Sequence, residues 1–177
     1  MIKHVAAALS LALLTACAGP VIDTDADPAV QFSQYHTYVW QQTPTDAPPL
    51  VKQRIVHAID AALQAKGWQR QDAGREADIG LAAHVATEQR QTLDTFYSDP
   101  GWNAWGWHGG WGMARTTVNT YDVGTLVVDM FDLKSQRAVW RGTVSGALPG
   151  SSEKLNQGLQ EGIAKLFDAF PPDSPAK

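Results

Sequence analysis

The sequence has 177 residues, the length of one domain built around a single hydrophobic core. Hydrophobic residues make up 44% of the chain and charged residues 18%, a balance typical of a folded globular protein rather than a disordered one. The formal net charge of -4 excludes a strongly basic chain, so no nucleic-acid partner is expected.

The N-terminal segment has the pattern of an export signal. Lys3 and His4 precede an apolar run over residues 5–14, which is shorter than the ~20 residues that span a bilayer but typical of a signal peptide. The run ends in the sequence LTAC at residues 14–17, which resembles the lipobox of bacterial lipoproteins. That resemblance implies cleavage after residue 16 and a thioether-linked diacylglycerol on Cys17.

Cys17 is the only cysteine of the chain, so a disulfide within the chain is excluded. We therefore predict a signal peptide over 1–16 and a lipidated cysteine with a tether over 17–29. The alternative is an ordinary secretory cleavage site with a chance cysteine. Ala18 follows the cysteine, where an aspartate is associated with retention in the inner membrane. The expected location is the periplasmic face of the outer membrane, held there by the lipid.

In the first half of the domain, the sequence predicts strands before and after one helix. A short strand is possible over 21–24, and residues 32–40 are rich in aromatic and β-branched residues, which indicates a strand. A proline-containing loop over 41–49 precedes a predicted helix over 50–66, which has one apolar stripe and ends before Gly67. Residues 77–87 alternate in polarity as a half-buried strand does. A polar continuation to Leu93 could extend this strand as an arm into the tryptophan-rich stretch.

The second half predicts an antiparallel meander and a second helix. The expected strands cover 114–121, 124–133 and 138–147, with turns at 122–124 and 134–137. A last helix over 153–170 is capped by Ser151 or Ser152 and stopped by Pro171. Gly158 and Gly162 share its apolar face, where we expect close packing of the helix against a sheet.

This order of elements predicts the fold class. Two amphipathic helices cannot cover both faces of a sheet of five or six strands. We therefore predict an α+β two-layer sandwich, in which a mostly antiparallel sheet of five or six strands carries both helices on one face. The single domain is expected over 30–171, followed by a short tail over 172–177.

The chain offers little for catalysis. It holds no H-E-x-x-H, C-x-x-C, G-x-S-x-G or phosphate-binding glycine loop, so no catalytic residue, metal or cofactor is predicted. His36 and His84 could meet across neighbouring strands and share a metal with Asp129. A pair of exposed or hydrogen-bonded strand histidines is the preferred interpretation of that pattern. A hydrolase is the third-ranked function.

The most unusual stretch is GWNAWGWHGGWGMA at residues 101–114, inside a predicted glycine- and tryptophan-rich loop over 99–113. Its candidate binding residues are Trp102, Trp105, Trp107, His108 and Trp111. Three interpretations compete. The loop folds back as a flap over the bare sheet face, it contacts a partner or ligand, or it touches the membrane interface, where tryptophan is favoured. The flap is preferred.

The landmarks together resemble the bacterial lipoproteins of domain-of-unknown-function family 4136. The matching stretches are Asp27-Pro28 with Phe32, Tyr35-x-x-Tyr38-x-Trp40, Lys66-Gly67-Trp68, Ala77-Asp78-Ile79, residues 124–129 with Asp132, and Val139-Trp140-Arg141-Gly142. No activity and no functional residue follow from the resemblance. On its strand, Trp140 should point into the core, while Arg141 pairs with Asp129 or Asp132.

The leading hypothesis is therefore a non-enzymatic, lipid-anchored binding or accessory module that meets another component of the cell envelope. The second hypothesis is a small-molecule or glycan binder that uses the tryptophans as stacking platforms.

Overall fold

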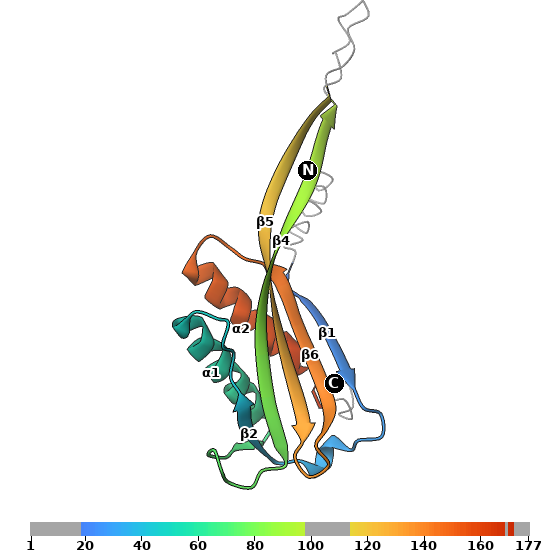
Figure 1. Cartoon of the computed structure of the whole chain (residues 1–177), viewed down its shortest axis with the longest axis vertical. Helices are drawn as coiled ribbons and strands as arrows, with labels where there is room; N and C mark the ends of the chain where they lie inside the picture. Colours follow the sequence, from blue (N-terminus) through green and yellow to red (C-terminus); the bar gives the residue numbers. More distant parts are fainter. Residues whose placement is uncertain (1–18, 98–113, 169, 172–177) are drawn as a thin grey trace, which may run out of the picture.

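The computed structural model describes residues 19–97, 114–168 and 170–171. Figure 1 shows an elongated molecule in which a twisted sheet carries two helices and continues into a narrow two-stranded extension. The elements in chain order are β1 (Val21–Ala26), the short 3₁₀ turn η2 (Phe32–Gln34), β2 (Thr37–Gln42), α1 (Pro49–Ala65), β3 (Gln69–Arg70), β4 (Ile79–Tyr97), β5 (Ala114–Asp132), β6 (Arg137–Ala147) and α2 (Ser152–Asp168).

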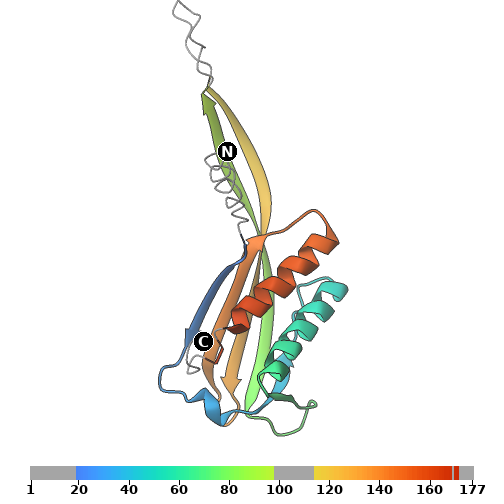
Figure 2. The ribbon, with the colours of Figure 1, turned by 180° about the vertical axis from the view of Figure 1, so that it is seen from behind.

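The six strands form one sheet in the order β1-β6-β5-β4-β2-β3. The pairs β1–β6, β6–β5 and β5–β4 are antiparallel, whereas β2 runs parallel to both β3 and β4. The parallel pairs arise because α1 carries the chain back across the sheet after β2. Both helices lie on the same side of the sheet in the two opposite views of Figures 1 and 2. The predicted α+β fold, with a mostly antiparallel six-stranded sheet and two helices on one face, is confirmed.

The hydrophobic core lies between the helices and the sheet. Residues directly opposite each other on neighbouring strands share a face, so Val128 and Leu126 of β5 face the same way as Gly142 and Val144 of β6. At one end of this layer, Phe170 packs in edge-on ring contacts against several other aromatic side chains. These partners are Phe32 at 5.5 Å, Trp68 at 5.5 Å, Trp140 at 5.2 Å and Phe167 at 5.8 Å, measured between ring centroids. The predicted core position of Trp140, which is 4% exposed, is confirmed.

The predicted turn at 122–124 is wrong, because β5 is one strand of 19 residues through that point. Gly124 pairs with both Thr87 and Gly146 in the sheet. A Cβ at Gly124 would lie 2.7 Å from Leu148 Cδ2, so the glycine marks a close approach rather than a reversal of the chain. The two strands predicted over 114–121 and 124–133 are therefore a single strand.

The two glycines of α2 have different roles. At Gly162 a Cβ would lie 2.6 Å from Val144 Cγ1, whereas at Gly158 nothing lies within 4 Å. The expected close packing of helix against sheet is thus correct at Gly162 and wrong at Gly158, which faces solvent. At the end of α1, Gly67 has a φ of 86°, the left-handed conformation that ends a helix and favours glycine.

The outer parts of β4 and β5 leave the sheet as a ribbon. The two strands pair continuously from Ile79 with Asp132 to Tyr97 with Ala114. Their neighbours stop earlier, since β2 pairs last at Ala82 of β4 and β6 ends opposite Val123 of β5. Residues 89–97 and 114–122 therefore form a two-stranded projection, which we call the arm (Figure 1). The nine residues over 114–122 give it a length of about 30 Å.

Candidate binding surface

The predicted binding loop is attached to the far end of the arm. Tyr97 and Ala114, the described residues on either side of it, pair directly with each other at that end. The candidate residues Trp102, Trp105, Trp107, His108 and Trp111 lie outside the described residues, and so does the predicted lipidation site Cys17. The arm is thus the part of the described structure that positions the candidate site.

The three interpretations of the loop concern residues 98–113, which lie outside the described residues. The flap, the partner or ligand contact and the membrane contact therefore stay predictions.

The sheet face opposite the helices, which we call the open face, carries one strong ion pair. Arg141 of β6 donates from Nε to Asp129 Oδ1 at 2.6 Å and from NH2 to Oδ2 at 3.0 Å. The two residues are direct cross-strand neighbours, and Asp25 of β1 lies on the other side of Arg141. The Asp129 hydrogen bonds, together with the carboxylate charge, raise the pKa of Arg141. The predicted pairing of Arg141 is confirmed for Asp129.

The possible metal set of His36, His84 and Asp129 is not assembled. The imidazole Nδ1 of His84 lies 3.4 Å from Gln42 Nε2, and both oxygens of Asp129 bind Arg141. His36 is exposed beside Asp78, to which its backbone N–H donates at 2.9 Å. Within the described ranges, no group of three histidine, cysteine or acidic residues is close enough to hold a metal ion.

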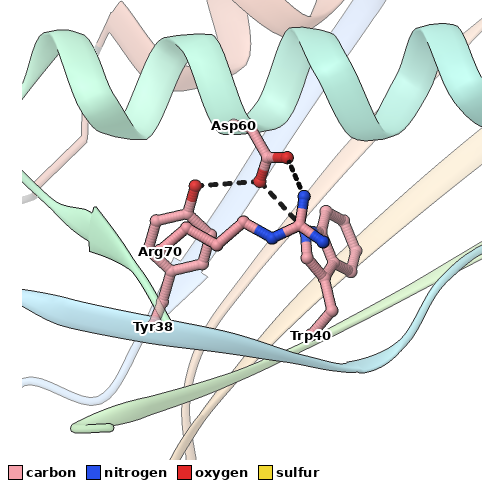
Figure 3. Close-up of polar contacts among 4 residues, drawn as sticks. All are labelled: Tyr38, Trp40, Asp60 and Arg70. Carbon is pink, nitrogen blue, oxygen red and sulfur yellow. Dashed lines mark hydrogen bonds and ion pairs between the residues drawn. The ribbon is translucent and has the colours of Figure 1, made fainter. Parts of the chain in front are cut away.

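A buried carboxylate that sequence reasoning missed joins α1 to the sheet (Figure 3). Asp60 is 8% exposed. Its Oδ1 accepts hydrogen bonds from the Tyr38 hydroxyl at 2.8 Å and from Trp40 Nε1 at 2.9 Å, and its Oδ2 accepts one from Arg70 NH1 at 2.6 Å. Burial, followed by the hydrogen bond to Asp60, raises the pKa of Tyr38.

The signal for this network was present in the sequence. Tyr38 and Trp40 are two residues apart in a predicted strand, so they share one face of it. A buried tyrosine or tryptophan needs a hydrogen-bond partner for its polar end. Asp60 lies beside Ile59 in the predicted helix, at the border of the apolar stripe. Three donors converge on its carboxylate, which fixes the side chain and ties α1 to β2 and β3. This arrangement is structural in character, because Asp60 is occupied by groups of the fold itself.

Two further carboxylates, Asp132 and Asp78, lie where β5 ends and β4 begins. Asp132 Oδ2 accepts the Tyr35 hydroxyl at 2.7 Å, and its Oδ1 accepts the backbone N–H groups of Lys134 and Ser135 at 2.8 Å each. The Ser135 N–H and the Tyr35 hydroxyl lower the pKa of Asp132. Burial, followed by the hydrogen bond to Asp132, raises the pKa of Tyr35 to about 12.

Asp78 accepts hydrogen bonds from residues at the start of β2. Its Oδ2 accepts both the Thr37 backbone N–H at 2.9 Å and the Thr37 hydroxyl at 2.8 Å, besides the N–H of His36. Burial opposes ionisation of Asp78, but these hydrogen bonds prevail and lower its pKa. The carboxylate thus fixes the start of β2 beside the start of β4.

Comparison with known proteins identifies the family of the chain. The family model for the domain of unknown function DUF4136 matches residues 22–172. The chain belongs to this family. The match begins within β1 and extends past α2, so it covers the arm as well as the sheet and helices. No curated protein sequence is significantly similar to the chain.

Solved structures share the fold at low sequence identity. A DUF4136 family protein from Bacteroides thetaiotaomicron is 18% identical with a TM-score of 0.55, over 86% of this chain and 96% of its own. A PDZ domain protein from Parabacteroides distasonis is 10% identical with a TM-score of 0.57, over 90% of this chain but only 38% of its own length. PelC from Paraburkholderia phytofirmans, which forms a dodecamer, is 16% identical with a TM-score of 0.50, over 83% of this chain and 94% of its own.

The residues that carried the resemblance to DUF4136 have structural roles in this chain. Asp78 and Asp132 cap strand ends, Gly124 and Gly142 allow close approaches, and Trp140 fills the core. These family landmarks therefore explain the fold.

Proposed function

We propose that this protein is a lipid-anchored lipoprotein of the periplasmic face of the outer membrane, and that it acts as a non-enzymatic binding or accessory module of the cell envelope. The observation that carries the proposal is the sequence LTAC at 14–17 after a ten-residue apolar run. Support comes from the position of the first strand, because β1 begins at Val21, four residues after Cys17. A cysteine so close to the folded domain would hold it at the membrane surface.

The use of the carboxylates supports a binding module rather than an enzyme. Asp60 joins a helix to the sheet, Asp129 pairs with Arg141 across two strands, and Asp132 caps a turn. Each of these groups is occupied by a donor from the fold. On the arm, residues 89–92 and 118–122 are all exposed.

A glycan or small-molecule binder is the second candidate. It is favoured by the four tryptophans between residues 102 and 111, because aromatic faces offer large, rigid contact areas. In soluble Cys17→Ser protein, this function predicts that sugars or peptidoglycan fragments change the tryptophan emission. Unchanged emission at saturating sugar would remove this candidate.

Fractionation of cells tests the proposed anchor. The unaltered protein is expected in the membrane fraction, and Cys17→Ser in the soluble periplasmic fraction. Equal thermal unfolding of the Cys17→Ser protein and a chain beginning at residue 19 would show that the substitution leaves the fold intact. Membrane association of Cys17→Ser with unchanged electrophoretic mobility would refute the anchor.

A further inference from the structure

The chain leaves the folded domain at the base of the arm. Val21, the first residue of β1, pairs with Ser145 of β6. Two residues later β6 ends at Ala147, opposite Val123, where the arm begins. The segment from Cys17 to Val21 spans at most ~14 Å when fully extended. A lipid on Cys17 would therefore hold the junction between the arm and the rest of the domain within that distance of the bilayer.

Exposed apolar side chains gather at this same end. Five large hydrophobic side chains of the described structure are exposed by 40% or more. Val118 and Tyr121 lie on the arm, Val21 starts β1, and Leu148 follows β6 and donates its N–H to Asp122 O at 2.8 Å. Only Leu50, at the start of α1, lies outside this group. The opposite end of the sheet presents the exposed polar residues 134–137 instead.

The arm is suited to a membrane surface and unsuited to the hydrocarbon interior. Its two strands pair only with each other in the described part of the chain, so their outer edges have backbone groups without strand partners. Backbone groups of this kind are strongly disfavoured inside the hydrocarbon of a bilayer, which offers them no hydrogen-bond partner. Arg90 and Tyr121, directly opposite each other on the arm, are residue types that favour the interface with lipid headgroups.

We propose that the arm lies against the surface of the bilayer that holds the anchor. This inference rests on the proposed lipidation of Cys17. The anchor is at the junction, so pointing the arm straight away from the membrane would drive the polar helix-bearing body toward the lipid. Pointing the body straight away would drive the arm into the hydrocarbon. The molecule is instead tilted, so that the arm lies against the surface as its second contact with the membrane and the opposite end of the sheet is held away from the lipid.

Neither described helix has the length and hydrophobicity of a membrane span. The contact proposed for the arm is peripheral, made by side chains of a β-ribbon and strengthened by the covalent lipid. An interfacial contact of this kind also fixes the direction in which the domain faces, which a flexible lipid tether alone does not do.

Site-specific quenching by spin-labelled lipid tests the inference. A lipidated Cys17 has no free thiol, so a cysteine introduced elsewhere is the only site for a fluorescent label. Thr120→Cys places the label on the arm, and the matched control Lys134→Cys places it on the exposed turn at the other end of β5. The two positions are about 40 Å apart along the strand. Both variants are bound to phosphatidylethanolamine and phosphatidylglycerol vesicles that contain spin-labelled phosphatidylcholine.

The expected result is a large loss of emission at residue 120 and little loss at residue 134, with both proteins floating with the vesicles. Equal emission at both positions in floating protein would overturn the inference, whether both are quenched or neither is. Protein that fails to float and whose Cys17 reacts with the label would refute the anchor itself, and the arm contact with it. Coincident thermal unfolding of the two variants and the parent excludes a folding defect.

Discussion

Gly142 sets the spacing between the sheet and α2, and replacing it should lower the free energy of unfolding. A Cβ at this position would overlap the Trp140 ring and would lie 2.6 Å from Leu166 Cδ1. Neither neighbour has room to move, because Leu166 is fully buried and the Trp140 ring packs against Phe167 at 5.7 Å. Overpacking of this kind costs about 1–3 kcal/mol. Alanine restricts the unfolded chain, which returns about 0.4–1 kcal/mol, so the net loss for Gly142→Ala is about 1–2 kcal/mol.

Gly146→Ala is the matched control, because it lies on the same face of the same strand. The nearest atom to a Cβ there is Pro20 Cα at 3.9 Å, which is an ordinary van der Waals contact. The same restriction of the unfolded chain should therefore leave Gly146→Ala unchanged or more stable by up to about 1 kcal/mol.

Urea unfolding of both variants, followed by circular dichroism, measures the difference. An equal change in the two free energies, or a gain in stability for Gly142→Ala, would refute the close approach of Trp140 and Leu166 to the β6 backbone. In a thermal melt, each kcal/mol corresponds to about 2–4 °C for a domain of this size.

Asp60→Ala should lower the free energy of unfolding by about 2–4 kcal/mol, because it leaves buried donors without an acceptor. The exposed control Asp72→Ala should lower it by less than about 1 kcal/mol. Equal losses in the two variants would contradict the network. Ile163→Ala, which truncates a buried side chain of α2, should cost about 2–5 kcal/mol in a denaturant melt, whereas a loss below about 0.5 kcal/mol would mean that the site is not packed. The folded-state pKa of Tyr35 is raised from 10.0 to about 12, so its contribution to stability is complete below pH 10 and is lost as the pH rises toward 12. Urea melts across this range should show a shallower decline for Tyr35→Phe than for the parent. The folded-state pKa of Asp132 is lowered, so its contribution is present at neutral pH and is lost as the pH falls through that pKa. Asp132→Asn should be less stable than the parent at neutral pH, and the difference should shrink as the pH falls through the lowered pKa. A difference that stays constant through acid pH would rule out the linkage.

The helices were the most predictable part of the fold. Apolar stripes and end signals predicted α1 over 50–66 and α2 over 153–170, against the observed Pro49–Ala65 and Ser152–Asp168. These signals are local, so a single sequence contains them in full. The strand β3 was not predicted, because a two-residue strand has no periodicity and forms only through its pairing with β2.

The continuity of β5 was not predictable from local rules. Gly124 follows Asp122 at the spacing of a turn, and nothing nearby in sequence shows that Leu148 lies over it. The arm was predictable only in part. The polar continuation to Leu93 indicated an extension toward the tryptophan-rich stretch, but the pairing that carries β4 to Tyr97 depends on a partner strand far along the chain.

Only the part of the candidate site that depends on local sequence was predictable. The pairing of Arg141 follows from strand alternation with acidic neighbours, and it was expected. The convergence of Tyr38, Trp40 and Arg70 on Asp60 joins three elements, so each residue alone gives only the hint of a buried polar group. The direction of the arm relative to the tether depends on the β1–β6 register, which no local pattern encodes.

Mass spectrometry of the intact mature protein, extracted from membranes with detergent, tests the central claim most directly. Lipidation at Cys17 predicts a chain that begins at residue 17 and whose N-terminal peptide carries a diacylglycerol on the cysteine sulfur. The Cys17→Ser protein supplies the unlipidated reference mass. A mature chain that begins at another residue, or that begins at Cys17 with a free thiol, would contradict the account.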